Sequence, residues 1–159
     1  MSVVAATPSQ TVGPFFSFGL CLREQHDLVD PARADAIRIG GLVLDGEDDP
    51  VNDAMVEIWD GSAWGRCGTD GEGRYGFVAA KPTGAGAPFL ATLVFARGLL
   101  KPVLTRIYFP GEPANATDPL LAALTDEERR SLIGVAAGDG EIRFDIHLQG
   151  ELQTTFLAV

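Results

Sequence analysis

Short runs of alternating apolar and polar residues set the pattern of this chain and predict β-strands. Two sets of side chains alternate within residues 51–59: Ala54, Val56 and Ile58 in one, Met55, Glu57 and Trp59 in the other. A period of two is typical of a strand with one buried face. Similar runs predict strands at 37–45, 74–80, 103–109 and 142–148, and a nearly continuous apolar run predicts a central strand, covered on both faces, at 89–96.

One segment carries helix-start signals instead of strand periodicity. Asp118-Pro119 places a proline at the first turn of a helix, and Thr125 followed by Glu128 matches a capping box. Turns rich in Gly, Pro and Asp separate the remaining runs. The sequence therefore predicts an all-β fold, an antiparallel β-sandwich with a short helical insertion near 118–133.

The first 36 residues differ from the rest of the chain. Residues 1–36 lack sustained periodicity and contain three prolines, so they are expected to form an extended arm and loop. Within the arm lie the apolar residues Val12, Phe15, Phe16 and Phe18. Because exposed apolar groups of this kind usually mark contacts, residues 7–20 are expected to be buried against a partner chain. No repeat or linker divides the sequence, which predicts a single domain over 1–159.

Composition and charge narrow the classes of function. The 159 residues include 19 Gly and 10 Pro, and the net charge of −10 argues against a nucleic-acid or anionic-membrane surface. Two cysteines, Cys21 and Cys67, are too few for a disulfide framework, which predicts reduced thiols and a cytoplasmic location. The first 20 residues contain no Lys or Arg and are broken by Pro, unlike a secretory signal or a membrane span.

The residues able to bind a metal are few and scattered. The chain has two His and two Tyr. His26 lies in the arm, His147 is predicted at a solvent-facing strand position, and Tyr108 is distant from both in the sequence. Ferric iron in a protein needs about four fixed ligands. Six acidic residues are attributed to solvated turns: Asp45, Asp48, Asp49, Asp53, Asp70 and Glu72.

Two tryptophans admit two interpretations. Trp59 and Trp64 could form a platform on which a ring stacks, or they could pack in the core or at a subunit interface. Packing is the interpretation we favour.

Four stretches of the sequence together resemble the intradiol ring-cleavage dioxygenases. They are TPSQTVGPFF at 7–16, the strand-and-turn block at 40–82, LVFARG at 93–98 with TRIYF at 105–109, and RFDIHLQGE at 143–151. The resemblance is strongest to the α chain of family members built from two different chains. In such enzymes the catalytic β chain holds a ferric ion with two Tyr and two His. The two His lie one residue apart on a strand, and this chain has Phe89 and Ala91 at their positions.

The resemblance implies a function that depends on a partner. The chain would be an iron-free α subunit, inactive alone, whose β partner holds Fe(III). The pair would cleave 3,4-dihydroxybenzoate with O2 to 3-carboxy-cis,cis-muconate, within a larger α–β oligomer. Arg97 and Thr11 match α-chain residues that approach the substrate carboxylate, which suits a forked cation and a hydroxyl donor. The residues alone leave alternatives open, namely an exposed charge at a strand end for Arg97 and a turn or capping hydroxyl beside Gly13-Pro14 for Thr11.

A rival interpretation is a free-standing binding module of the transthyretin-like or carboxypeptidase-regulatory-like type. The block at 40–82 fits such a β-sandwich nearly as well. The arm at 7–16 and the segment at 143–151 favour the dioxygenase family, because a generic module has no reason to carry them. The loops at 60–68 and 83–88 are short, and the preferred dihydroxybenzoate therefore stays open.

Overall fold

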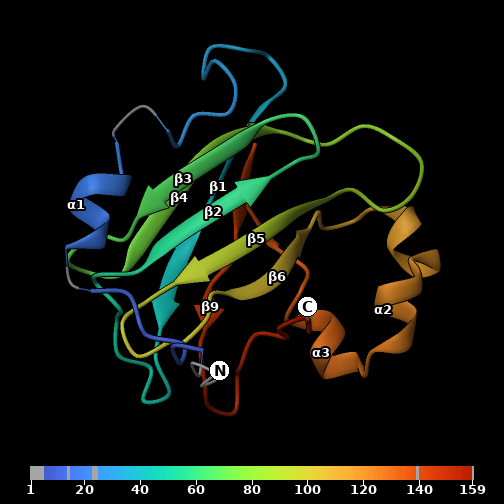
Figure 1. Ribbon diagram of the computed structural model, residues 1–159. Helices are drawn as coiled ribbons and strands as arrows, with labels where there is room; N and C mark the ends of the chain where they lie inside the picture. The colour runs from blue at the N-terminus through green and yellow to red at the C-terminus, as the bar shows by residue number, and fades with distance from the viewer. Residues whose placement is uncertain (1–5, 14, 23–24, 139, 159) are drawn as a thin grey trace, which may run out of the picture.

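Two β-sheets pack face to face in the computed structural model, which describes residues 6–13, 15–22, 25–138 and 140–158, without the side chains of residues 17 and 18 (Figure 1). In spatial order the first sheet contains β4 (Arg74–Ala80), β1 (Ala36–Leu44), β8 (Glu141–Arg143) and β7 (Val135–Gly138), and β9 (Ile146–His147) also pairs with β1. The second contains β3 (Trp64–Gly68), β2 (Met55–Trp59), β5 (Phe89–Phe95) and β6 (Val103–Tyr108). The predicted β-sandwich is confirmed.

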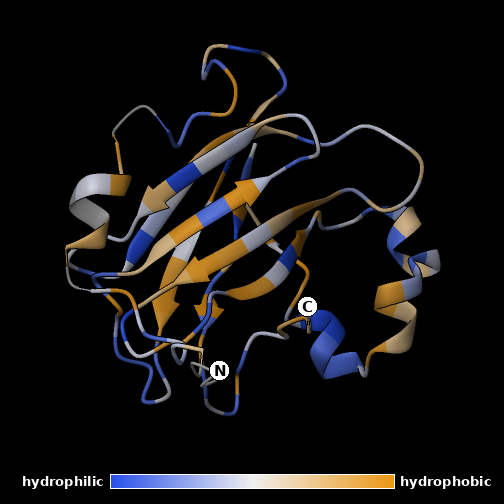
Figure 2. Ribbon diagram, in the orientation of Figure 1, coloured by the Kyte–Doolittle hydropathy of each residue, from blue (hydrophilic) through white to orange (hydrophobic). Residues whose placement is uncertain are grey.

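The inner faces of the two sheets form one hydrophobic core. Its members alternate along their strands, as the period of two requires: Ile39, Val43, Tyr75, Phe77, Ile142 and Ile146 in the first sheet, Val56, Ile58, Leu90, Val94 and Ile107 in the second. Figure 2 shows the apolar stretches of β2 and β5 that contribute to this core. The outer face of β5 is half-buried, so the expectation of a strand covered on both faces is only partly met.

The first sheet is mixed and not purely antiparallel, which corrects the predicted architecture. β1 pairs antiparallel with β4 but parallel with β8 and β9. The predicted strand at 142–148 is interrupted between β8 and β9, where Phe144 N donates to Gly40 O at 2.8 Å. A Cβ on Gly41 would lie 2.1 Å from Phe144 O, so this close approach of the two backbones requires glycine. Buried and exposed residues still alternate through the break. The periodicity of the sequence could therefore reveal neither the interruption of the strand nor the direction in which it pairs with β1.

Two strands escaped the sequence analysis, and one is shorter than predicted. β3 lies within the segment interpreted as a short loop at 60–68, because Asp60 folds the chain back on itself. Its Oδ1 accepts N–H groups from Ser62 at 2.7 Å and Ala63 at 2.6 Å, which sets Trp64 opposite Trp59. The four exposed residues of β7 gave no alternation to recognise. The strand predicted at 51–59 begins only at its fifth residue.

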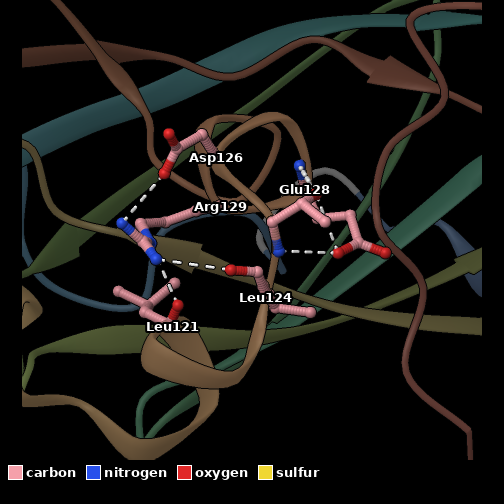
Figure 3. A network of polar contacts seen from close by, with 6 residues as sticks. Leu121, Leu124, Asp126, Glu128 and Arg129 are labelled. Carbon is pink, nitrogen blue, oxygen red and sulfur yellow. Dashed lines mark hydrogen bonds and ion pairs between the residues drawn. The ribbon is translucent and has the colours of Figure 1, made fainter.

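The predicted helical insertion is confirmed as three short helices: η1 (Pro113–Thr117), α2 (Pro119–Ala123) and α3 (Asp126–Arg130). Asp118 accepts the N–H groups of Leu120 and Leu121, and Thr125 with Glu128 forms the predicted capping box. Arg129 joins the helices, because its Nε donates to Leu121 O at 2.9 Å and its Nη2 to Leu124 O at 3.3 Å (Figure 3).

The N-terminal arm is held against both sheets. It contains a short helix, α1 (Phe16–Leu20), that the sequence did not predict. Further along, Leu28 N donates to Val78 O at 2.8 Å on β4, and Arg66 N on β3 donates to Gln25 O at 2.8 Å. The arm therefore covers one edge strand of each sheet, which protects backbone groups that would otherwise be open to pairing. No helix among the described residues has the length and apolar character needed to cross a membrane.

Candidate functional site

Arg97 leaves the end of β5 on a tight turn. The preceding Ala96 is buried in the core, and Leu99 N donates back to Ala96 O at 3.3 Å. Gly98 has φ +90°, a conformation that glycine adopts without strain. The side chain of Arg97 is 57% exposed. The turn therefore fixes the backbone of Arg97 at the sheet end and directs its guanidinium toward the surface.

Thr11 reaches this turn from the arm. Gly98 N donates to Thr11 Oγ1 at 2.8 Å, across 87 positions of sequence. The alternative drawn from the sequence was a cap on a turn of the arm itself, whereas the observed contact caps the distant turn at Gly98. This contact does not use up the hydroxyl, because a Thr hydroxyl that accepts one hydrogen bond still has its own hydrogen to donate. Of the two residues singled out from the sequence, Thr11 therefore lies at the turn that directly follows Arg97.

Asp53 is a third member of this cluster, and the sequence analysis missed it. Its Oδ2 accepts a hydrogen bond from Arg97 Nε, and the carboxylate side chain is only 22% exposed. Asp53 lies in a turn, as interpreted from the sequence, but its side chain is largely covered and paired instead of solvated. Asp53 lies inside the segment 51–59 that the sequence predicted as a strand, and nothing in that segment signals an ion pair with a residue 44 positions away.

The Thr11–Arg97–Asp53 cluster combines a cation, a hydroxyl and a carboxylate at one end of the second sheet. Among the described residues, neither Nη1 nor Nη2 of Arg97 makes a hydrogen bond, and Asp53 holds the guanidinium at Nε. A guanidinium with two free terminal nitrogens can bind a carboxylate through both oxygens. The arrangement is thus chemically suited to an organic acid.

Phe89 and Ala91 lie at the other end of β5 and present apolar groups. The Phe89 ring packs against Tyr108 at 5.4 Å, and Arg106 Cζ lies 3.9 Å from its centroid. Both residues line a cavity of about 230 Å³, together with Trp59, Asp60, Gly61 and the loop 82–88. The lining contains no His, Cys or Tyr. Within the described part of the chain no group of three or more His, Cys, Asp or Glu could hold a metal, so the residues present do not fit a ferric ion.

The two histidines lie apart from this cavity and from each other. His26 Nε2 lies 3.6 Å from Asp27, and His147 Nδ1 lies 3.2 Å from Asp48. The side chain of His147 is only 16% exposed, which corrects its predicted solvent-facing position. The segment that follows it covers this residue: His147 N bonds to Thr154 Oγ1 at 3.0 Å.

Both tyrosines act as structural hydrogen-bond donors. Tyr75 Oη donates to Phe144 O at 2.6 Å, and complete burial raises its pKa well above the usual 10. Tyr108 Oη donates to Asp118 at 3.1 Å and accepts from Arg106 at 3.0 Å; burial raises its pKa as well. Burial therefore favours the neutral phenol in both residues, whereas a metal-bound tyrosine is a phenolate.

The two tryptophans face each other across β2 and β3. Trp59 and Trp64 are 53% and 45% exposed, so the core part of the packing interpretation is wrong. Arg66 Cζ lies 4.7 Å from the Trp64 ring, and Arg66 also bonds to Glu57 Oε1 at 2.8 Å. These contacts hold Trp64 at the surface and leave its outer side open.

Comparison with known proteins gives a consistent picture. No family model matches the chain. It is 32% identical to the protocatechuate 3,4-dioxygenase alpha chain of Burkholderia cepacia, over all of both chains. It is also 32% identical to that of Pseudomonas putida, over 98% of each chain. The B. cepacia alignment is 199 positions long, so that relative carries insertions that this chain of 159 residues lacks. The beta chain from B. cepacia is 30% identical over 68% of this chain and 61% of its own length.

Solved structures show the same fold. The dioxygenase domain of a carbohydrate-binding fusion protein from Streptomyces sp. SirexAA-E superposes with a TM-score of 0.63 at 22% identity, over 91% of this chain and 99% of that one. Catechol 1,2-dioxygenase from Pseudomonas arvilla C-1 gives 0.60 at 22% identity, over 78% and 55%. From its full-length identity to the alpha chains, this chain belongs to the intradiol ring-cleavage dioxygenase family.

Proposed function

We propose that this chain is the iron-free α subunit of a protocatechuate 3,4-dioxygenase and acts with an iron-binding β chain. The full-length identity to two such alpha chains supports this assignment. The observation that carries it is the convergence of Thr11 and Arg97 from distant parts of the sequence on one turn. The apolar residues Phe89 and Ala91 support placing the metal in the partner.

The reaction adds both atoms of O2 to 3,4-dihydroxybenzoate and opens the ring between its two hydroxylated carbons, giving 3-carboxy-cis,cis-muconate. Iron in the β chain would bind the two ring oxygens and make the ring reactive toward O2. This chain contributes to binding. Arg97 pairs with the carboxylate on the far side of the ring and Thr11 donates its hydroxyl hydrogen, which together fix the orientation of the ring.

The β chain would also strengthen the contact between Arg97 and the substrate carboxylate. The Arg97 side chain is 57% exposed in the chain alone, and water weakens an exposed ion pair. Docking of the β chain over this end of the sheet would exclude that water. The proposal therefore requires an α–β boundary at the Thr11–Arg97–Asp53 cluster. We also propose that the protein is cytoplasmic, which the free thiols of Cys21 and Cys67 support.

Substitution of Arg97 in the reconstituted α–β complex tests the proposal. Arg97→Ala should raise KM for protocatechuate roughly tenfold or more, because a charge-assisted hydrogen bond contributes about 1.5–3 kcal/mol. KM for catechol, which lacks the carboxylate, should change far less. Arg97→Lys should recover only part of the loss, because an ammonium cannot reproduce the fork.

Arg130→Ala is the matched control. Arg130 is also exposed and has no ion pair among the described residues, so its loss should leave both KM values as they are. The purified chain alone should be colourless, with iron only in the complex. Equal effects of Arg97→Ala on both substrates, or one tightly held iron per isolated chain, would refute the assignment. Failure to associate with any β chain would favour a free-standing binding module.

A further inference from the structure

The carboxylate of Asp53 occupies one donor of the Arg97 guanidinium and leaves the others open. Asp53 Oδ2 accepts from Nε, the nitrogen nearest the backbone. The terminal nitrogens Nη1 and Nη2 bond to none of the residues that the structure describes. We propose that Asp53 is a positioning residue, which holds Arg97 by Nε so that the Nη1–Nη2 edge faces the substrate carboxylate. This inference rests on the proposed function of Arg97.

Asp53 is attached to a rigid part of the fold. Thr69 fixes the turn that carries it through three hydrogen bonds: Ala54 N donates to Thr69 Oγ1 at 3.0 Å, Thr69 N donates to Ala54 O at 2.9 Å, and Thr69 Oγ1 donates to Val51 O at 2.8 Å. Ala54 itself is completely buried. The Asp53 side chain, 22% exposed, therefore has a stable base from which to orient a longer and more mobile one.

The geometry of guanidinium explains why a hydrogen bond at Nε should help Arg97 bind the substrate carboxylate. The group is planar, with its five N–H donors in fixed directions, so a bond at Nε determines where Nη1 and Nη2 point. An exposed Arg side chain loses rotamer freedom when it binds a ligand, and this loss lowers affinity. A contact that is already made in the free protein removes much of the loss before the substrate arrives.

Asp53 also bears a negative charge near the place proposed for an anionic substrate. If this repulsion dominated, removing Asp53 would strengthen protocatechuate binding and lower KM. The repulsion is screened because Arg97 lies between the two carboxylates and its side chain is more than half exposed. Positioning and repulsion thus predict opposite signs of the change in KM, and a single set of variants separates them.

The experiment measures KM and kcat of the reconstituted α–β complex with protocatechuate and with catechol. Asp53→Ala should raise KM for protocatechuate roughly three- to tenfold, with kcat changed less than twofold and little effect on KM for catechol. Asp53→Asn should recover part of the loss, because its amide oxygen still accepts from Nε without the charge. Asp49→Ala is the control: it removes the same charge from an exposed side chain that bonds to none of the described residues, and KM should not change.

Other results would overturn either the positioning role of Asp53 or the proposed function. A lower KM for either Asp53 variant overturns the positioning role in favour of repulsion, and an unchanged KM overturns it outright. Thermal unfolding and co-purification with the β chain check that the variants fold. If these fail for Asp53→Ala, Asp53→Asn must still raise KM for protocatechuate selectively. If Arg97→Ala is selective for protocatechuate and Asp53→Ala is not, only the role of Asp53 is wrong. If Arg97→Ala is not selective, the proposed function itself is wrong.

Discussion

Replacing Tyr75 by Phe removes one buried oxygen and tests what holds the break between β8 and β9 in place. Tyr75 lies on β4, and its hydroxyl donates to Phe144 O at 2.6 Å. Phe144 follows β8, in the segment that runs beside β1 and passes close to Gly41. The hydrogen bond thus joins β4 to the chain beyond β8 across the intervening strand β1.

The structure sets the expected size of the effect. No other described residue donates to Phe144 O, so Tyr75→Phe leaves a buried carbonyl without a partner. An unsatisfied buried acceptor costs about 1–3 kcal/mol, and the lost hydroxyl leaves only a small void. We expect the free energy of unfolding to fall by about 2 kcal/mol. For a chain of this length that corresponds to a Tm lower by about 4–8 °C.

Urea and thermal unfolding of the purified chain, followed by circular dichroism, measure this loss. Tyr108→Phe is the matched control, because it removes the same atom in a different setting. Asp118, which accepts from Tyr108 Oη, keeps the N–H groups of Leu120 and Leu121. The Tyr108 substitution should therefore cost less than about 1 kcal/mol.

Comparing Tyr75→Phe with Tyr108→Phe shows whether the hydrogen bond from Tyr75 to Phe144 O stabilises the fold. If Tyr75→Phe costs less than about 0.5 kcal/mol, or no more than Tyr108→Phe, then the bond to Phe144 contributes little. The close packing of Gly41 against this segment would then be what fixes the segment beside β1.

Two further predictions concern local hydrogen bonds. Thr125→Ala should lower the free energy of unfolding by about 1 kcal/mol in urea titrations, whereas Thr125→Ser, which keeps the hydroxyl that accepts from Glu128 N, should not. Asp70 accepts the N–H groups of Arg74 and Glu72 at 2.9 Å each, and these bonds lower its pKa below 3.8. The stabilisation is therefore present above pH 3.8 and lost as the pH falls through the lower folded pKa, so Asp70→Asn should flatten the acid side of a Tm-against-pH curve. An unchanged slope would contradict this.

Much of the fold follows from local sequence patterns. Alternating residues in 74–80 predicted β4 with its exact bounds, and Thr125 with Glu128 predicted the start of α3. Both signals act between residues that are near one another in the chain. A strand with one buried face must alternate, and a capping box joins groups three residues apart, so the sequence alone was sufficient for these elements.

The direction of pairing and the composition of the candidate site required the tertiary structure. Alternation in 142–148 is the same for a parallel and an antiparallel strand, and only the pairing of β8 and β9 with β1 shows that this segment runs parallel to β1. Thr11 and Arg97 were identified by resemblance to a family, but Asp53 meets Arg97 across 44 positions of sequence. No local pattern records such a contact, because it exists only once β2 and β5 pair antiparallel within one sheet, which brings the turn before β2 beside the end of β5.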